Sequence, residues 1–267
     1  MFDKIIYKDI INMQSQQFEW HEQWSMLQDN ELFLFQEWID PFTLGDFRDK
    51  EVLEGGCGGG QHTHFIAPYA KHIIAIDLNT IDIIAKARNK QHHNITFLEA
   101  DIATMELGKK FDVILSIGVI HHTDDPEKAV DNLKIHLKEG GILLLWVYSE
   151  EGNWMVKHLI EPLRKVFLCH SNRKSLLIFA KIITIFLYLP IYSLYLLPLP
   201  LLPYYEYFQN FRKLSFYRNT LNVFDKLNAP QVDFISFTRA KALVKDLHHA
   251  QVSPYKGVSW RISGIKA

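Results

Sequence analysis

The chain has 267 residues, of which 48% are apolar and 22% charged, so it can form one large domain, or one domain with a sizeable insertion. A formal net charge of −1 argues against bulk binding of nucleic acid. Two cysteines, Cys57 and Cys169, are too few for a disulfide framework or a zinc site. The N-terminal residues lack the layout of a signal peptide, and we therefore expect a protein of the reducing cytoplasm.

Residues 1–45 are expected to form a helical cap. Gln17, Trp20, His21 and Trp24 fall at three- and four-residue spacings, which would place them along one face of a helix. The two tryptophans would dock such a helix by burying apolar surface.

Between residues 51 and 77, a glycine-dense turn separates two apolar strands. The first strand ends in Glu54, the turn carries glycine at positions 55, 56, 58, 59 and 60, and the second strand ends in Asp77. Glycine removes the Cβ atoms that would keep a ligand from the backbone, and open α/β sheets bind nucleotides at such turns. Glu54 would repel a pyrophosphate and suits a cationic ligand with an ammonium and a sulfonium group. The alternative is an ordinary tight turn from strand to helix.

Further elements follow in an alternating α/β pattern. A helix is expected over 81–90, and then a strand over 95–98 that leads to Asp101. Asp77 can accept hydrogen bonds from both hydroxyls of an adenosine ribose. The alternative, that Asp77 caps the next helix, is weaker because Asn79 or Thr80 could supply that cap. His62 and His64 are two residues apart and do not share a helical face, so no metal site is expected.

The fourth and fifth strands enclose a helix with a marked beginning. Residues 111–116 and 142–147 are apolar runs typical of buried parallel strands. Asp125 and Pro126 predict a helix that begins with a capping carboxylate and a proline in its first turn. We expect this helix to continue to Gly140.

Two motifs resemble those of class I S-adenosylmethionine-dependent methyltransferases of the small-molecule and lipid type. Glu-x-Gly-x-Gly-x-Gly at 54–60 resembles their first motif. Phe-Asp-Val-Ile at 111–114, followed by Val-Ile-His-His-Thr-Asp-Asp-Pro at 119–126, resembles the motif at their fourth strand. The resemblance covers roughly residues 50–150. It implies a Rossmann-like α/β fold with a seven-stranded sheet of order 3-2-1-4-5-7-6, an antiparallel last strand and helices on both faces.

The resemblance also implies a site for S-adenosylmethionine, with S-adenosylhomocysteine as the product. The methionine portion is expected at the first motif and the end of strand four, the ribose at the end of strand two, and the adenine after strand three. The expected contacts are Glu54, Gly56, Cys57, Gly58, Gly60, Asp77, Leu78, Asp101, Ile102, Ser116 and Ile117.

The acceptor site is less visible, because methyl transfer needs alignment and exclusion of water more than covalent help. A general base is needed only for a hydroxyl or an acidic carbon, and the candidates are His121, His122 and Tyr148. A structural hydrogen bond is the alternative role for each. Candidate substrate contacts are Tyr148 and, because the cap of similar sequences touches substrate, Trp20, His21 and Trp24.

Residues 150–237 have no counterpart in the minimal fold and read as an apolar, basic helical insertion. Residues 151–220 contain nine Lys or Arg against three acids, and no charge occurs from 182 to 205. That length permits a membrane-spanning helix, but Pro190 is expected to interrupt it after a short run. Seven of the eleven tyrosines lie within 176–217, a composition typical of interfaces. A lid over the substrate, a membrane-surface contact through 176–217 and a spanning helix remain open, and the first two are compatible.

Residues 238–267 are expected to complete the cofactor-binding core of residues 46–149. Thr238 could cap a helix that continues to about His249, followed by two short strands in a hairpin. The sequence thus predicts a cytoplasmic methyltransferase, with peripheral membrane contact as an option, that acts at oxygen or carbon of a small or lipid-like acceptor. Alternatives are an RNA or protein methyltransferase, or a non-catalytic scaffold of the same fold.

Overall fold

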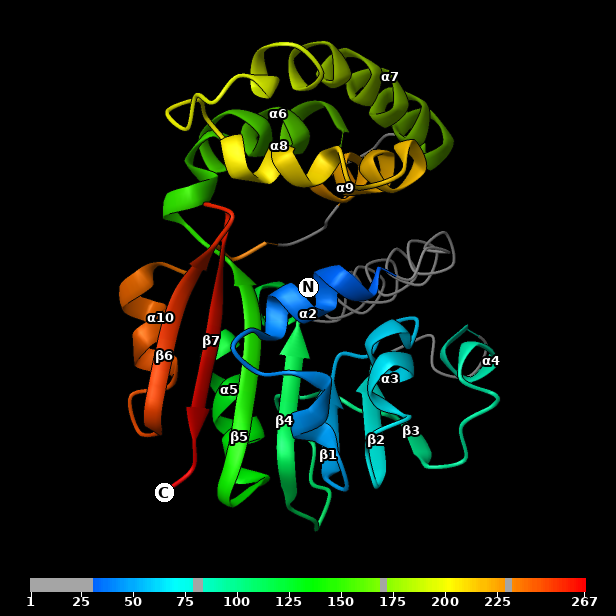
Figure 1. The fold of residues 1–267 in the computed structure, drawn as a ribbon, viewed down its shortest axis with the longest axis vertical. Helices are drawn as coiled ribbons and strands as arrows, with labels where there is room; N and C mark the ends of the chain where they lie inside the picture. Colours follow the sequence, from blue (N-terminus) through cyan, green and yellow to red (C-terminus); the bar gives the residue numbers. More distant parts are fainter. Residues whose placement is uncertain (1–30, 79–83, 169–171, 229–231) are drawn as a thin grey trace, which may run out of the picture.

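The computed structural model describes residues 31–78, 84–168, 172–228 and 232–267. Within these ranges one seven-stranded sheet has the order β3-β2-β1-β4-β5-β7-β6 (Figure 1), which confirms the predicted topology. Strands β1 to β5 are parallel, and β7 runs antiparallel to β5 and β6. The strands are β1 (Glu51–Gly55), β2 (His72–Asp77), β3 (Ile95–Glu99), β4 (Phe111–Ile117), β5 (Leu137–Tyr148), β6 (His248–Tyr255) and β7 (Ser259–Ile265).

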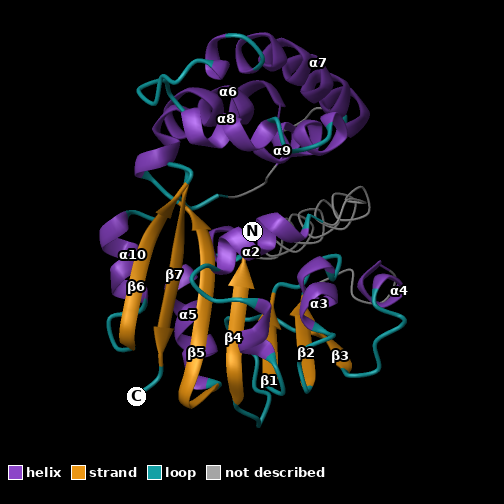
Figure 2. Ribbon diagram, in the orientation of Figure 1, coloured by secondary structure: helices purple, strands orange, loops and turns teal. Residues whose placement is uncertain are grey.

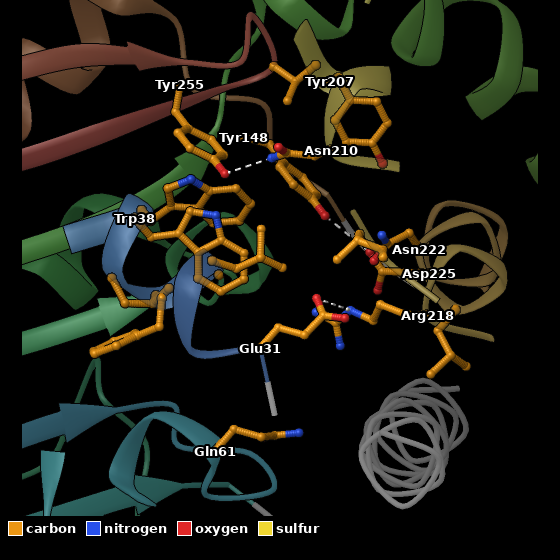
Figure 3. A pocket seen from close by; sticks show the side chains of 18 of the residues that line it. Glu31, Trp38, Gln61, Tyr148, Tyr207, Asn210, Arg218, Asn222, Asp225 and Tyr255 are labelled. Carbon is orange, nitrogen blue, oxygen red and sulfur yellow. Dashed lines mark hydrogen bonds and ion pairs between the residues drawn. The ribbon is translucent and has the colours of Figure 1, made fainter. Parts of the chain in front are cut away.

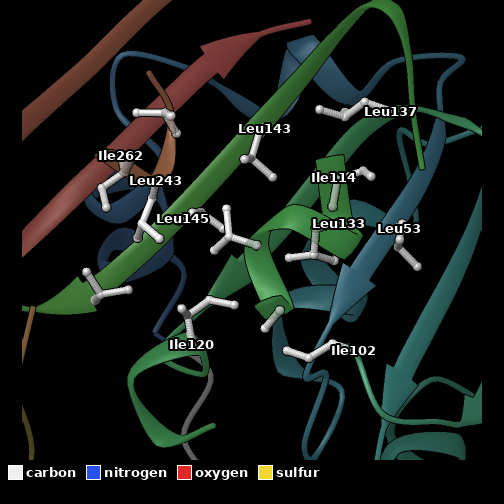
Figure 4. Packing of buried hydrophobic residues seen from close by; sticks show 14 of the residues in the cluster. Leu53, Ile102, Ile114, Ile120, Leu133, Leu137, Leu143, Leu145, Leu243 and Ile262 are labelled. Carbon is white, nitrogen blue, oxygen red and sulfur yellow. The ribbon is translucent and has the colours of Figure 1, made fainter. Parts of the chain in front are cut away.

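The central strands are buried on both faces, which explains their continuous apolar runs. Successive side chains alternate between faces, so Leu53 and Ile114 point to one cluster while Val52 and Val113 point to the other. The first cluster, shown in Figure 4, packs against α5 (Pro126–Ile135) and α10 (Phe237–Leu243). The second packs against α2 (Leu32–Ile39), η1 (Leu44–Phe47) and α3 (Gln61–Ile66). The helices on both faces therefore follow from the buried strands.

Two predicted helix boundaries were wrong. Helix α5 begins as predicted, with the Asp125 carboxylate accepting from the Lys128 backbone, but it ends at Ile135, because the chain joins strand β5 from Leu137. Helix α10 is capped by the Ser236 side chain and ends at Leu243. The residues from His248 onward instead form strand β6, whose hydrogen bonds to β7 complete the sheet.

The segment between β5 and α10 forms a separate helical layer beyond the carboxyl ends of the parallel strands (Figures 1 and 2). It has its own apolar cluster, which includes Leu176, Phe211 and Phe224. Its elements are η4 (Glu151–Asn153), η5 (Val156–Ile160), α6 (Glu161–Leu163), η6 (Arg164–Leu168), α7 (Arg173–Ile191), η7 (Leu194–Leu196), α8 (Tyr205–Phe211) and α9 (Phe216–Asn228).

The expected interruption of the uncharged run 182–205 at Pro190 is confirmed to within one residue. Helix α7 ends at Ile191, directly after Pro190, but it is longer than expected because it begins at Arg173, before the uncharged run. Lys174–Ile191 is long and apolar enough, by length and composition, to cross a membrane, and it alone meets that criterion among the described helices. Only 22% of this 18-residue window is buried in the fold.

Candidate functional site

The glycine turn between β1 and α3 needs glycine for its backbone conformation. Gly56, Gly58 and Gly60 have φ values of +80°, +50° and +70°, in the left-handed region. A Cβ on Gly56 would lie 2.4 Å from the Val119 side chain, and one on Gly60 would lie 2.6 Å from the Asn89 amide. The turn therefore depends on bare backbone at alternate positions.

Glu54 lies at the head of this turn and is 1% exposed. Its Oε2 accepts a hydrogen bond from the Thr63 hydroxyl. Its Oε1 lies 3.5 Å from His62 Nδ1 and has no hydrogen-bond partner within the described ranges. A buried carboxylate oxygen in this condition requires a donor or a cation, so the position fits the ammonium group of a methionine portion.

Two further carboxylates lie at the same edge of the sheet, at the ends of the next two strands. Asp77 ends β2, and its Oδ2 accepts from the Gly58 backbone at 2.8 Å. Asp101 follows β3, and its Oδ1 accepts from the Ala103 backbone at 2.8 Å. Parallel strands place their carboxyl ends together, so Glu54, Asp77 and Asp101 stand on three neighbouring strands beside bare backbone.

The other expected cofactor contacts differ in exposure and in hydrogen bonding. Cys57 and Ile102 are buried, and Leu78 is exposed. Burial, followed by the charges of Glu54 and Asp77, raises the pKa of the Cys57 thiol well above its usual range, so it remains protonated. The Ser116 hydroxyl donates to the Gly55 carbonyl at 2.8 Å and ties β4 to β1, so that hydrogen bond is structural.

A cavity of about 200 Å³ lies between the sheet edge, α2 and the helical insertion (Figure 3). Gln61 and His62, directly after the glycine turn, line one end, so the cavity adjoins the acidic cradle. Within the described ranges, eight aromatic side chains line the cavity. These are Phe35, Trp38, Phe65, Trp146, Tyr148, Tyr207, Phe211 and Tyr255.

Three cavity-lining side chains carry buried N–H groups that lack a hydrogen-bond partner in the described part of the chain. They are the indole nitrogens of Trp38 and Trp146 and the Gln61 amide nitrogen. The two indole rings lie 5.1 Å apart between centroids. Buried donors are normally satisfied, so these three suit a ligand that carries an oxygen acceptor.

Helix α9 forms the opposite wall with polar side chains. Tyr148 Oη donates to Asp225 Oδ2 at 3.2 Å, and Arg218 Nε lies 4.0 Å from Glu31 Oε2 (Figure 3). Lys226 Nζ lies 4.9 Å from the centroid of the Tyr148 ring. Burial lowers the pKa of Lys226, but Tyr207, Tyr148 and Asp225 outweigh it, so the pKa is raised and the amine stays charged. Burial raises the pKa of Tyr148, which stays protonated.

The Tyr255 hydroxyl joins three parts of the fold beside the cavity through two hydrogen bonds. Tyr255 of β6 donates to Glu37 Oε2 of α2 at 2.6 Å and accepts from the Asn210 amide of α8 at 3.1 Å. Burial and then Glu37 raise the pKa of Tyr255, so the phenol keeps its proton. The insertion is thus held on the core by hydrogen bonds as well as by packing.

The two adjacent histidines occupy different environments. His122 lines the cavity, whereas His121 is 1% exposed and lies behind it, with its ring centroid 4.3 Å from that of Tyr148. His121 Nδ1 has no hydrogen-bond partner within the described ranges. Burial, then His122 and Lys226, lower the pKa of His121 well below its usual value, so its ring is neutral near pH 7. Of the pair, His122 is the one placed to meet an acceptor.

The structure brings together at the cavity His122, Tyr148 and Ile117 from the predicted set, while Asp77 and Asp101 lie outside its lining. Trp20, His21 and Trp24 fall outside the described residues. The sequence analysis missed the contribution of α9. Arg218, Asn222 and Asp225 recur at i, i+4 and i+7, so the helical period could have indicated one polar face. In the described ranges, no group of three His, Cys, Asp or Glu side chains could hold a metal ion.

Comparisons with known proteins agree with this arrangement. Residues 53–145 match the family model described as a methyltransferase domain. A tRNA U34 carboxymethyltransferase from Alteromonas mediterranea is 30% identical over 115 residues, which cover 40% of this chain and 35% of that protein. A ubiquinone biosynthesis O-methyltransferase from Rickettsia typhi is 28% identical over 102 residues, covering 38% and 42% respectively. The match thus spans less than half the length of either relative.

Among solved structures, an O-methyltransferase family protein from Burkholderia thailandensis superposes with a TM-score of 0.53. Its sequence identity is 12%, and the alignment covers 88% of this chain and 56% of that one. This likeness extends over the insertion as well as the core, and at that identity it supports the fold alone.

Proposed function

We propose, from the premise that this chain contains a class I S-adenosylmethionine-dependent methyltransferase domain, that it transfers a methyl group to a small acceptor held in the aromatic cavity. One observation carries the proposal: the acidic glycine cradle and the cavity adjoin at Gln61 and His62. A cofactor in the cradle would therefore present its reactive end to a site that α2 and the insertion cover.

The cradle residues are assigned by the groups they can bind. Glu54 Oε1 would hold the ammonium of the methionine portion, Asp77 the ribose hydroxyls, and Asp101 with the Ile102 backbone the adenine edge. When bound, the cofactor supplies a methyl group that its sulfonium has already activated. The protein then has to align the acceptor and exclude water.

The cavity supports an acceptor with a planar or apolar body and at least one oxygen. Aromatic walls give apolar contact, and the unpaired N–H groups of Trp38, Trp146 and Gln61 suit an oxygen acceptor. The charges on α9 are balanced, with Lys226 beside Asp225 and Arg218 beside Glu31, so they position the acceptor more than they select its net charge. A covered cavity of about 200 Å³ favours small molecules over RNA or protein acceptors.

We assign proton removal to His122, for an acceptor that reacts at a hydroxyl or an acidic carbon. It lines the cavity at the end of the loop that follows β4, where strand ends face the site of transfer. Tyr148 stays protonated and donates its only O–H to Asp225, so it would orient the acceptor through its ring and by accepting a hydrogen bond at Oη.

The experiment is transfer of a labelled methyl group from S-adenosylmethionine to a panel of small phenols, quinols, enols and carboxylic acids. We expect turnover of at least one hydroxylated ring or enol. His122→Asn should lower kcat by about 100-fold or more at unchanged cofactor affinity, and His158→Asn, on the helical insertion, should leave kcat unchanged. Cofactor binding without transfer to any acceptor in the panel would contradict the proposed acceptor class, and equal kcat in both variants would contradict the role of His122.

A further inference from the structure

Helix α7 is apolar on two sides, and the fold covers only one of them. Leu176, Ala180 and Ile191 form the covered side and pack in one cluster with residues of α8 and α9. A helix that is apolar all round is normally buried all round, in a large core or in lipid. The other side of α7 therefore requires a cover that this chain does not supply within its described residues.

We call the exposed apolar side chains of the helix and of the segment after it the outer face. On the helix it repeats at three- and four-residue spacings, and Phe186 and Leu189 are 66% and 69% exposed. In the loop, Leu201 is 98% exposed. The outer face consists of Ile178, Ile182, Ile185, Phe186, Leu189, Leu196, Leu197, Leu199 and Leu201.

The charges on α7 itself are of one sign. Lys174 and Lys181 are exposed and lie at i−4 and i+3 from Ile178, so they share its stripe. Neither lysine forms an ion pair with another described residue, and no Asp or Glu occurs between Glu161 and Glu206. Exposed apolar side chains with interspersed lysines and no acids match a lipid surface that carries anionic headgroups.

We propose that the outer face docks this protein on the surface of an anionic lipid bilayer, with α7 lying along the membrane. The outer-face side chains would enter the boundary between headgroups and acyl chains, while Lys174 and Lys181 extend to the phosphates. A spanning orientation would remove Leu176, Ala180 and Ile191 from the cluster that holds the insertion together. A symmetric contact with a second copy would bring these lysines together without acids to pair with them.

The cavity lies close to the outer face, separated from it by α9. Helix α9 packs against α7 on one side and lines the cavity on the other (Figure 1). The docked protein would hold its acceptor cavity one helix layer away from the lipid. The docking proposal depends on the geometry of the insertion and not on the proposed methyl transfer, so the two can fail separately.

The test is co-sedimentation of the full-length chain with vesicles of phosphatidylcholine, with and without phosphatidylserine. We expect binding to the anionic vesicles that weakens with salt and is much weaker on neutral ones. The double variant Phe186→Glu/Leu189→Glu should stay in the supernatant. Ile135→Glu, an exposed isoleucine of α5 in the core, is the matched control and should sediment as the unaltered chain does. Replacing Lys174 or Lys181 by Gln should weaken vesicle affinity about fivefold each.

Titration with S-adenosylhomocysteine keeps the test independent of folding and of the proposed activity, because every one of these variants should bind it as the unaltered chain does. Failure of the unaltered chain to bind anionic vesicles would overturn the docking proposal. Equal sedimentation of the Phe186→Glu/Leu189→Glu variant would also overturn it. The proposal would also be overturned if light scattering showed that the unaltered chain is a dimer, that the Phe186→Glu/Leu189→Glu variant is a monomer, and that vesicles do not change the oligomeric state.

Discussion

The sheet and the helical insertion bury their apolar residues in different ways. In the sheet, Leu53 and Val52 point to two different apolar clusters, one on each face, and helices pack against both. In the insertion, one side of α7 is buried and its outer face is exposed. Helix α9 instead directs the polar side chains of Arg218, Asn222 and Asp225 to the cavity. The difference is the basis of our two proposals: that the sheet edge holds the cofactor, and that the insertion selects the acceptor and docks the protein.

The largest effect is expected from a substitution of Gly56, which would disrupt the turn on the sheet side and leave the insertion unchanged. Gly56→Ala adds a Cβ that collides with Val119 and strains a left-handed backbone, so we expect a loss of about 2–5 kcal/mol in the free energy of unfolding and loss of cofactor binding. Gly108→Ala is the matched control, since φ is +59° there and nothing lies within 4 Å of the added Cβ. Its cost should be about 1–2 kcal/mol. Urea unfolding measures both, and equal losses would show that Val119 does not restrict the turn.

A smaller effect is expected where the core and the insertion meet the acceptor. Trp38→Phe keeps the aromatic wall and removes the unpaired indole N–H, so the KM for an oxygen-bearing acceptor should rise roughly tenfold at unchanged cofactor affinity. Trp154→Phe, on an exposed tryptophan of the insertion, should not change KM. Steady-state kinetics at saturating cofactor measures both. An unchanged KM in the Trp38 variant would mean that its N–H does not contact the acceptor.

The smallest effect concerns pH. The pKa of His121 is lowered in the folded chain relative to about 6.5 when unfolded, so the unfolded chain binds more protons below that pH. His121 therefore stabilises the fold above pH 6.5, and the stabilisation is lost as pH falls, with a slope of up to about 1.4 kcal/mol per pH unit. Urea unfolding at pH 7.5 and 5.5 should show this decline in the unaltered chain. His121→Phe should flatten it, and an equally steep decline in that variant would assign the pH dependence to other groups.

Sequence reasoning predicted the sheet well because its signals are local. Apolar runs mark strands with two buried faces, and the alternating glycines mark a turn that only glycine can adopt. It placed Glu54, Asp77 and Asp101 at strand ends, and the sheet order brings those ends together.

The acceptor cavity could not be predicted in the same way, because it is formed by residues far apart in the chain. Trp38, Trp146 and Lys226 meet only when the insertion folds over the sheet. The C-terminal end of α10 could not be predicted either, because no glycine or proline follows Leu243 closely. The pairing of β6 with β7 sets that boundary instead. Pro190 marked the end of α7 correctly, but the length of the helix was underestimated because α7 begins at Arg173, before the uncharged run.

The central claim is that Glu54 completes a cradle for a positively charged nucleoside. Isothermal titration with S-adenosylhomocysteine, whose ammonium group Glu54 Oε1 would bind, tests it most directly. Glu54→Gln should weaken the affinity by about tenfold or more, while Glu51→Gln, at the opposite end of β1, should leave it unchanged. Equal affinity in the two variants, or no binding by the unaltered chain, would contradict the account.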